Sequence, residues 1–244
     1  MNQAPITAEA HRQTRWLAPN GSTHVLLLRH GATEGLRGDS DRFPLTDGHG
    51  DPNLSEDGEL QARFTADRLI IEDLDAIYVT TLIRTHQTAA PIAERLGLEP
   101  RVEPDLREVF LGEWEGGLTR VHAALGDERW LKAVEEGEWG HIPGAETTAQ
   151  LIERSMRALE TIVHLHPGER VLCVVHGGVI AAVVRAVTGS KDAFGGADNC
   201  SLTHLVSVNG KWRVRCFNDT AHLGGFTPAT HRPNEADLAG WVRH

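Results

Sequence analysis

Two histidines in this sequence each follow a run of apolar residues and precede a glycine. His30 comes after Val-Leu-Leu-Leu-Arg at residues 25–29, and His176 comes after Val-Leu-Cys-Val-Val at residues 171–175. Short apolar runs of this kind are typical of strands that are covered on both faces in parallel α/β sheets. The carboxyl ends of such strands form the ligand crevice of an open sheet. If the two strands are neighbours, both imidazoles enter one crevice.

Two arginines and a glutamate complete a set of charged residues that suits chemistry on a phosphate ester. Arg29 and Arg84 can each donate bidentate hydrogen bonds to nonbridging phosphate oxygens. Neutral His30 could attack phosphorus and form a phosphohistidine, while cationic His176 would donate a further hydrogen bond to the transferring group. Glu108 could protonate the leaving oxygen and then deprotonate water.

Alternating strands and helices must position these residues. Ser55 and a capping box of Thr147 with Gln150 each predict the start of a helix, and Asn209-Gly210 predicts a hairpin. We expect a long loop over residues 32–53 and a helix-poor acidic lid around Trp130 and Trp139. The expected helices cover residues 55–71, 83–96, 147–163 and 179–187, and the expected strands cover residues 25–29, 76–79, 171–175, 202–208 and 212–217, with a short one at 102.

Bulk composition limits the class of protein. The 244 residues include 24 basic and 34 acidic side chains, and the net charge of −10 opposes binding to nucleic acid or to anionic membranes. Three cysteines and no apolar signal or membrane-spanning run favour a cytoplasmic location. We expect one domain over residues 23–223, with an N-terminal tail (1–22) and a C-terminal tail (224–244).

Rival sites are weaker. His164 and His166 close a predicted helix without a third ligand at a suitable spacing, so we expect no metal and no cofactor. Phosphate-cradling GxxxxGK[ST] and nucleophilic GxSxG motifs are both absent from the sequence. Four acids of the long loop favour a solvated face or, alternatively, a selector for a cationic substrate group: Asp39, Asp41, Asp47 and Asp51.

Several ordered blocks over residues 25–223 resemble the histidine phosphatase superfamily, in its phosphoglycerate-mutase-like branch. They are Arg-His-Gly-Ala-Thr at 29–33, Leu-Ser-Glu-Asp-Gly at 54–58, Arg-Thr-His-Gln-Thr-Ala at 84–89, Leu-Arg-Glu at 106–108, Gly-Glu-Trp-Glu-Gly at 112–116, Gly-Ala-Glu-Thr at 144–147, Val-His-Gly-Gly at 175–178 and Asn-Asp-Thr-Ala-His-Leu at 218–223. The resemblance implies an α/β fold with a mixed, mostly parallel sheet between helices on both faces. It also implies catalysis without a metal, on a small phosphorylated substrate.

The resemblance implies a role for each candidate residue. His30 is the expected phospho-acceptor, Arg29, Arg84 and His176 bind the phosphoryl group, and Glu108 is the proton donor. From the residues themselves, the Thr33 hydroxyl can either donate to phosphate or stabilise a turn, and Gly177 leaves backbone free to contact a substrate. Three acids compete with Glu108 for its role: Glu103, Glu113 and Glu115.

One departure and two alternative functions remain at this point. Leu36 stands where the family often carries an asparagine that contacts phosphate, so that contact is missing or is supplied elsewhere. Mutases of the family carry adjacent arginines after the catalytic acid, whereas residues 109–143 have only Arg120, Arg129 and Lys132 as separate cations. We therefore predict a phosphatase, with a phosphoglycerate mutase and a noncatalytic binding module as alternatives. The resemblance also allows a homodimer.

Overall fold

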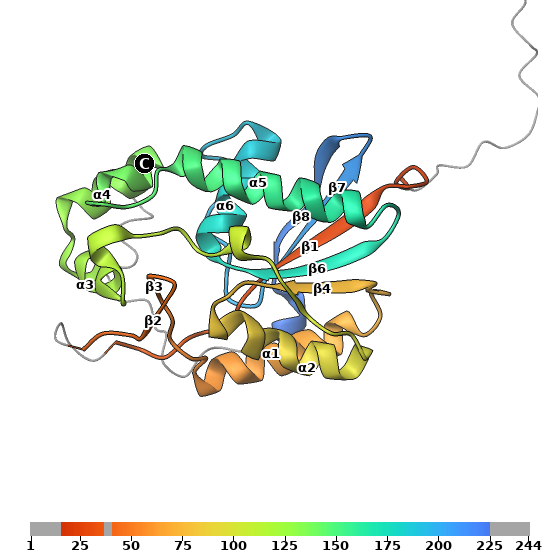
Figure 1. Cartoon of the computed structure of the whole chain (residues 1–244), viewed down its shortest axis with the longest axis horizontal. Helices are drawn as coiled ribbons and strands as arrows, with labels where there is room; N and C mark the ends of the chain where they lie inside the picture. The colour runs from red at the N-terminus through yellow and green to blue at the C-terminus, as the bar shows by residue number, and fades with distance from the viewer. Residues whose placement is uncertain (1–15, 37–40, 225–244) are drawn as a thin grey trace, which may run out of the picture.

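The computed structural model describes residues 16–36 and 41–224. Its main sheet has six strands in the order β5-β4-β6-β1-β7-β8 (Figure 1). The β5, β4, β6 and β1 strands run parallel, and β7 and β8 are antiparallel to their neighbours, which confirms the mixed, mostly parallel sheet. The strands are β1 (Thr23–Arg29), β4 (Ala76–Val79), β5 (Arg101–Val102), β6 (Arg170–Val175), β7 (Leu202–Val208) and β8 (Lys211–Asp219).

The two predicted histidine-bearing strands are direct neighbours. Arg29 at the end of β1 is in register with Val175 at the end of β6, and the His30 amide donates to the Val175 carbonyl at 3.0 Å. His30 and His176 therefore leave the sheet at the same level and on the same edge.

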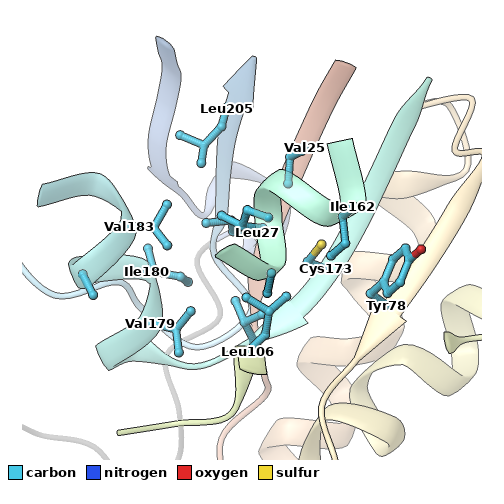
Figure 2. Close-up of a cluster of buried hydrophobic side chains, with 14 of the residues drawn as sticks. Val25, Leu27, Tyr78, Leu106, Ile162, Cys173, Val179, Ile180, Val183 and Leu205 are labelled. Atoms are coloured by element: carbon cyan, nitrogen blue, oxygen red, sulfur yellow. The ribbon is translucent and has the colours of Figure 1, made fainter. Parts of the chain in front are cut away.

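Helices cover both faces of the sheet. Helices α1 (Glu56–Leu69) and α2 (Ile83–Leu96) lie on one side, and α5 (Thr148–Leu165) and α6 (Gly177–Thr188) lie on the other (Figure 1). Since side chains alternate along a strand, Leu26 of β1 packs toward α1 and α2 whereas Leu27 packs toward α5 and α6. Figure 2 shows the second of these cores, with Leu27 beside residues of α6.

The predicted starts of helices and the predicted turn are confirmed. The Ser55 side chain accepts the Gly58 amide before α1, and Thr147 forms a reciprocal capping box with Gln150 before α5. Asn209 and Gly210 both have positive φ between β7 and β8, as a two-residue hairpin requires.

The prediction of a helix-poor lid is wrong. The segment between Trp114 and Trp139, which we continue to call the lid, contains α3 (Leu118–Leu125) and α4 (Glu128–Glu136). Both helices pack around the buried Trp114. Gly117, Gly126 and Gly137 stand in left-handed conformations at the helix ends, so these glycines bound short helices and do not interrupt a loop. Short 3-10 helices flank the lid and the last strand, at Pro104–Leu106, Gly112–Trp114, Trp139–His141 and Ala221–Leu223.

The long loop predicted over residues 32–53 contains a small hairpin. Strands β2 (Leu45–Thr46) and β3 (His49–Gly50) pair antiparallel around Asp47 and Gly48, which both have positive φ. In Figure 1 this hairpin lies beside α3. Residues 1–15, 37–40 and 225–244 fall outside the described part, so Asp39 and most of both predicted tails do too.

No helix in the described part of the chain is long and apolar enough to cross a bilayer. The domain boundaries, the homodimer and the cytoplasmic location stay predictions.

Candidate active site

A cavity of about 1,290 Å³ opens where β1 and β6 end. Its wall brings together Arg29, His30 and Arg84 with Glu108 and Thr33, which come from separate stretches of the sequence. His176 lies fully buried next to this wall, with its ring centroid 5.2 Å from that of His30. Of the two glycines that follow His176, Gly178 lines the cavity, whereas Gly177 packs against the Arg29 side chain.

His30 is held in one tautomer. Its Nδ1 lies 2.8 Å from the Gly31 carbonyl, and a carbonyl only accepts, so the proton is on Nδ1. Its Nε2 accepts from Arg84 Nε at 3.3 Å. Burial, followed by the charges of Arg84 and Arg29, holds the pKa of His30 well below its ordinary value. A neutral ring with its lone pair on Nε2 is the form that can act as a nucleophile.

His176 is oriented from behind by a threonine. Its Nε2 lies 3.1 Å from Thr80 Oγ1, and its buried Nδ1 has no partner among the described residues. Burial and the Arg84 charge hold the pKa of His176 well below its ordinary value, which favours a neutral ring in the free enzyme and not the expected cation. When Nε2 accepts the Thr80 hydroxyl, the proton stands on Nδ1 and can be donated to an anion.

The two arginines are anchored by backbone carbonyls. Arg29 Nη1 donates to the Ala197 carbonyl at 2.5 Å, while its Nε is buried without a partner in the described residues. Arg84 Nη1 donates to the Gly50 carbonyl at 2.9 Å. Burial lowers the pKa of both side chains, but guanidinium groups stay charged in proteins. The cavity floor is therefore positively charged and suited to a phosphate dianion.

Glu108 points into this floor from the loop before the lid. Its carboxylate accepts from the amides of Val109 at 2.9 Å and Gly178 at 3.3 Å. A Cβ on Gly178 would overlap Glu108 Oε1, so a larger residue here would displace the carboxylate. Behind it, Arg154 donates to the Glu108 carbonyl at 2.8 Å and fixes the loop.

The competing acids have other tasks. Glu115 accepts the amides of Gly50 and Leu111, both at 2.7 Å, and so joins the long loop to the lid. Glu103 caps the 3-10 helix that begins at Pro104. Glu113 is not among the residues that line the cavity.

Gly31, which follows His30, serves packing and not ligand binding. Its amide donates to Thr88 Oγ1 at 3.0 Å and not to a ligand, and a Cβ there would approach the Gly58 carbonyl to 2.6 Å. Gly31 is thus needed for close packing of the strand end against α1.

Sequence reasoning missed one cation at this site. Arg120 of α3 donates to Thr33 Oγ1 at 2.6 Å and to the Glu34 carbonyl at 2.7 Å, and lies 4.9 Å over the Phe43 ring. Although Arg120 is exposed, partial desolvation at the cavity wall and the Arg29 charge lower its pKa. It contributes a charge to the cavity beside the loop where Leu36 replaces the usual asparagine.

Residues 25–220 match the model of the histidine phosphatase superfamily, branch 1. The chain belongs to this superfamily. A metal-independent phosphoserine phosphatase of Arabidopsis thaliana is 32% identical over 222 residues, which cover 88% of this chain and 91% of the relative. A protein of Photorhabdus laumondii named a probable phosphoglycerate mutase is 34% identical over 218 residues, covering 84% of this chain and 96% of the relative.

Solved structures of the superfamily share the fold. A mycobacterial glucosyl-3-phosphoglycerate phosphatase superposes with a TM-score of 0.68 at 29% identity, covering 82% of this chain and 100% of that one. The same mycobacterial enzyme has been solved with inorganic phosphate. The fold prediction is thus confirmed by members of this histidine phosphatase superfamily.

Proposed function

We propose that this chain is a metal-independent phosphomonoesterase that acts on a small phosphorylated metabolite through a phosphohistidine on His30. The observation that carries the proposal is the fixed His30 ring, whose Nε2 lone pair faces Arg84 at 3.3 Å within the charged cavity. Relatives named as phosphatases in plants and mycobacteria support it.

In the first step, the lone pair of His30 Nε2 forms a bond to phosphorus as the bond to the ester oxygen breaks. Arg29, Arg84 and the Nδ1 proton of His176 donate to the equatorial oxygens and neutralise their charge. Glu108 gives a proton to the departing oxygen, so the product leaves as an alcohol.

In the second step, water resolves the phosphohistidine. Glu108, now ionised, takes a proton from the water as its oxygen attacks phosphorus. The P–N bond breaks, its electron pair returns to His30 Nε2, and inorganic phosphate leaves. One carboxylate therefore serves both halves of the cycle.

Turnover of an aryl phosphate by wild type and by His30→Ala tests the proposal. We expect His30→Ala to lose at least about 1,000-fold in activity and to trap no phosphoenzyme after an alkaline quench, which preserves the P–N bond of wild type, because the nucleophile is gone. The exposed His164 on α5 provides a matched control, and His164→Ala should keep full activity. Equal activity of wild type and His30→Ala would refute the mechanism, and activity lost in EDTA would refute metal independence.

The mutase alternative is disfavoured by the cations of the lid. Arg129 donates to both carboxylate oxygens of Asp127 and lies over Trp114, and Lys132 pairs with Glu136. Of the three basic residues noted in this stretch, only Arg120 lines the cavity. Supplying 3-phosphoglycerate with a trace of bisphosphoglycerate separates the two reactions. Release of inorganic phosphate supports the phosphatase, and formation of 2-phosphoglycerate without phosphate supports the mutase.

Arg120 indicates the kind of substrate. Its planar guanidinium is fixed by Thr33, Glu34 and Phe43 and suits a carboxylate on the leaving group. The relatives named for phosphoserine and for glucosyl-3-phosphoglycerate support a phosphorylated carboxylic acid.

A pair of esters tests this assignment. We expect wild type to prefer phosphoserine over phosphoethanolamine, which lacks the carboxylate, and Arg120→Met to abolish the preference. Arg129→Met, a neighbouring lid variant, should retain it. Equal preference in wild type and Arg120→Met would exclude this role for Arg120.

A further inference from the structure

Asp51 is a buried carboxylate in the loop whose acids were expected to face solvent or a substrate cation. Its exposed fraction is 7%, and the cavity is lined by its neighbours Gly50 and Pro52 but not by Asp51 itself. A carboxylate in such surroundings requires hydrogen-bond donors or a cation. Asp51 therefore serves a group within the protein and not a ligand.

That group is the start of α2. Asp51 Oδ1 accepts the Ile83 amide at 2.9 Å and forms an ion pair with Arg84 Nη1 at 3.4 Å, while Oδ2 accepts the Thr46 hydroxyl at 2.8 Å. The residue that precedes α2, Leu82, offers no side-chain cap, so Asp51 caps the helix from a distant loop. One carboxylate thus holds both the helix start and the arginine that the helix presents.

The Arg84 guanidinium is restrained at two of its three nitrogens. Nε faces His30 Nε2 at 3.3 Å, and Nη1 is held by Asp51 and by the Gly50 carbonyl at 2.9 Å. These contacts set the plane of the guanidinium and leave Nη2 for a substrate oxygen. A tilt of this plane would move the Nη2 donor away from the phosphate oxygen, and a contact of this kind depends on geometry.

We propose that Asp51 is a positioning residue that fixes Arg84 for phosphoryl binding and transfer. This inference rests on the phosphatase activity proposed above. It assigns the long loop a part in catalysis, because Thr46 and Gly50 of the β2–β3 hairpin complete the support of one arginine.

Asp51→Asn tests the assignment, because it keeps the size of the side chain and removes its charge. We expect kcat/KM for an aryl phosphate to fall at least about tenfold, with a higher KM and a lower kcat per folded molecule, because both binding and transfer use Arg84. We also expect the Kd of inorganic phosphate, measured by calorimetry, to increase several-fold.

Asp47→Asn is the matched control on the same hairpin. Asp47 is 57% exposed on its side chain, and asparagine tolerates its positive φ, so this variant should behave as wild type.

A double-mutant cycle separates positioning from a purely structural cap. If Asp51 acts through Arg84, Asp51→Asn in an Arg84→Ala background should change kcat/KM by less than about twofold. A cap that only stabilises α2 would lower the melting temperature and the folded fraction equally in both backgrounds, with KM and phosphate Kd unchanged. That result, or an Asp51→Asn variant equal to wild type in an active enzyme, would overturn the inference. Wild type that binds phosphate but cleaves no ester would instead refute the phosphatase proposal, and the phosphate Kd of the variants would still decide the role of Asp51.

Discussion

The rings of His30 and His176 lie edge to face with their centroids 5.2 Å apart, and Arg84 places its positive charge near both. A proton on either ring would add a cation to a buried site that already holds two arginines. This arrangement favours two neutral imidazoles, which suits the roles proposed for them, His30 as nucleophile and His176 as donor through Nδ1.

The pH profile of kcat/KM should reflect this pair. Because His30 must be neutral and its pKa is lowered, activity should persist as pH falls below about 6.5, the ordinary histidine value. The decrease of kcat/KM on the acid side should therefore occur at a lower pH, and its midpoint should be assigned to the coupled pair of His30 and His176. If His176 donates as a neutral ring, kcat/KM should not decrease on the alkaline side near pH ~6.5, where an ordinary imidazolium loses its proton. Initial rates from pH about 4.5 to 9 check both limbs, and a midpoint at or above about 6.5 on the acid side would contradict the assignment.

Thr80 should matter through the tautomer of His176. Thr80→Val removes the partner of Nε2 and should lower kcat/KM about tenfold or more, because the Nδ1 proton is no longer fixed toward the phosphoryl group. Thr80→Ser keeps the hydroxyl and should restore most of the activity. Steady-state kinetics of both variants, with circular dichroism to verify folding, make the comparison, and equal rates for the two would argue against this role.

Glu108→Gln should affect esters according to their leaving groups. An alkyl phosphate should lose about 100- to 10,000-fold in kcat, since its alkoxide needs a proton. A nitrophenyl phosphate should still phosphorylate His30 and give a burst of nitrophenol, followed by slow hydrolysis without the general base. Rapid-mixing kinetics measure this burst, and Glu103→Gln, whose carboxylate caps a 3-10 helix, is the control. Equal losses for both esters would show that Glu108 is not the acid.

A methyl group at position 178 should displace the acid without unfolding the chain. The Cβ of Gly178→Ala would overlap Glu108 Oε1, so we expect a large loss of kcat. Gly196→Ala meets no atom within 4 Å and should be active. Activity assays with melting temperatures test the pair, and a fully active Gly178→Ala would show that catalysis does not require Glu108 to lie against the start of α6.

Acid should destabilise the fold through a second pair of histidines, on β1 and β7. Burial and the neighbouring His24 lower the pKa of His204 to about 4. A hydrogen bond of 2.9 Å joins His24 Nδ1 and His204 Nε2. Between pH about 6.5 and 4 the unfolded chain binds a proton that the folded ring does not, so the free energy of unfolding decreases as pH falls. Melting curves of wild type and His204→Gln at pH about 7.5 and 5 test this, and the variant should lose fewer degrees on acidification. An equal loss in both proteins would assign the acid sensitivity elsewhere.

Much of the scaffold was predictable because its signals are local. Apolar runs such as residues 171–175, the Ser55 cap and the Asn209-Gly210 turn each depend on a few consecutive residues. The rule that ligands bind at the carboxyl ends of parallel strands placed His30 and His176 on one edge of the sheet, and the structure supplies the adjacency of their strands.

The missed features depend on contacts across the chain. Arg120 resembles any lid arginine until α3 brings it to Thr33, and Asp51 resembles a loop acid until it meets Arg84. The lid helices are short, and Gly117 and Gly126 stand at their ends. Sequence spacing has no signal for such pairings, which form only when the fold is complete.

Strand β1, which ends next to His30, has both of its sheet neighbours, β6 and β7, in the last third of the chain. During synthesis His30 therefore emerges well before the two strands that flank β1. A chain stopped before residue 170 would carry His30 on a strand with neither edge paired, and pairing across so many residues is slow. The site around His30 is therefore complete only when β6 and β7 have paired with β1. A ligand that binds this site stabilises the whole folded domain.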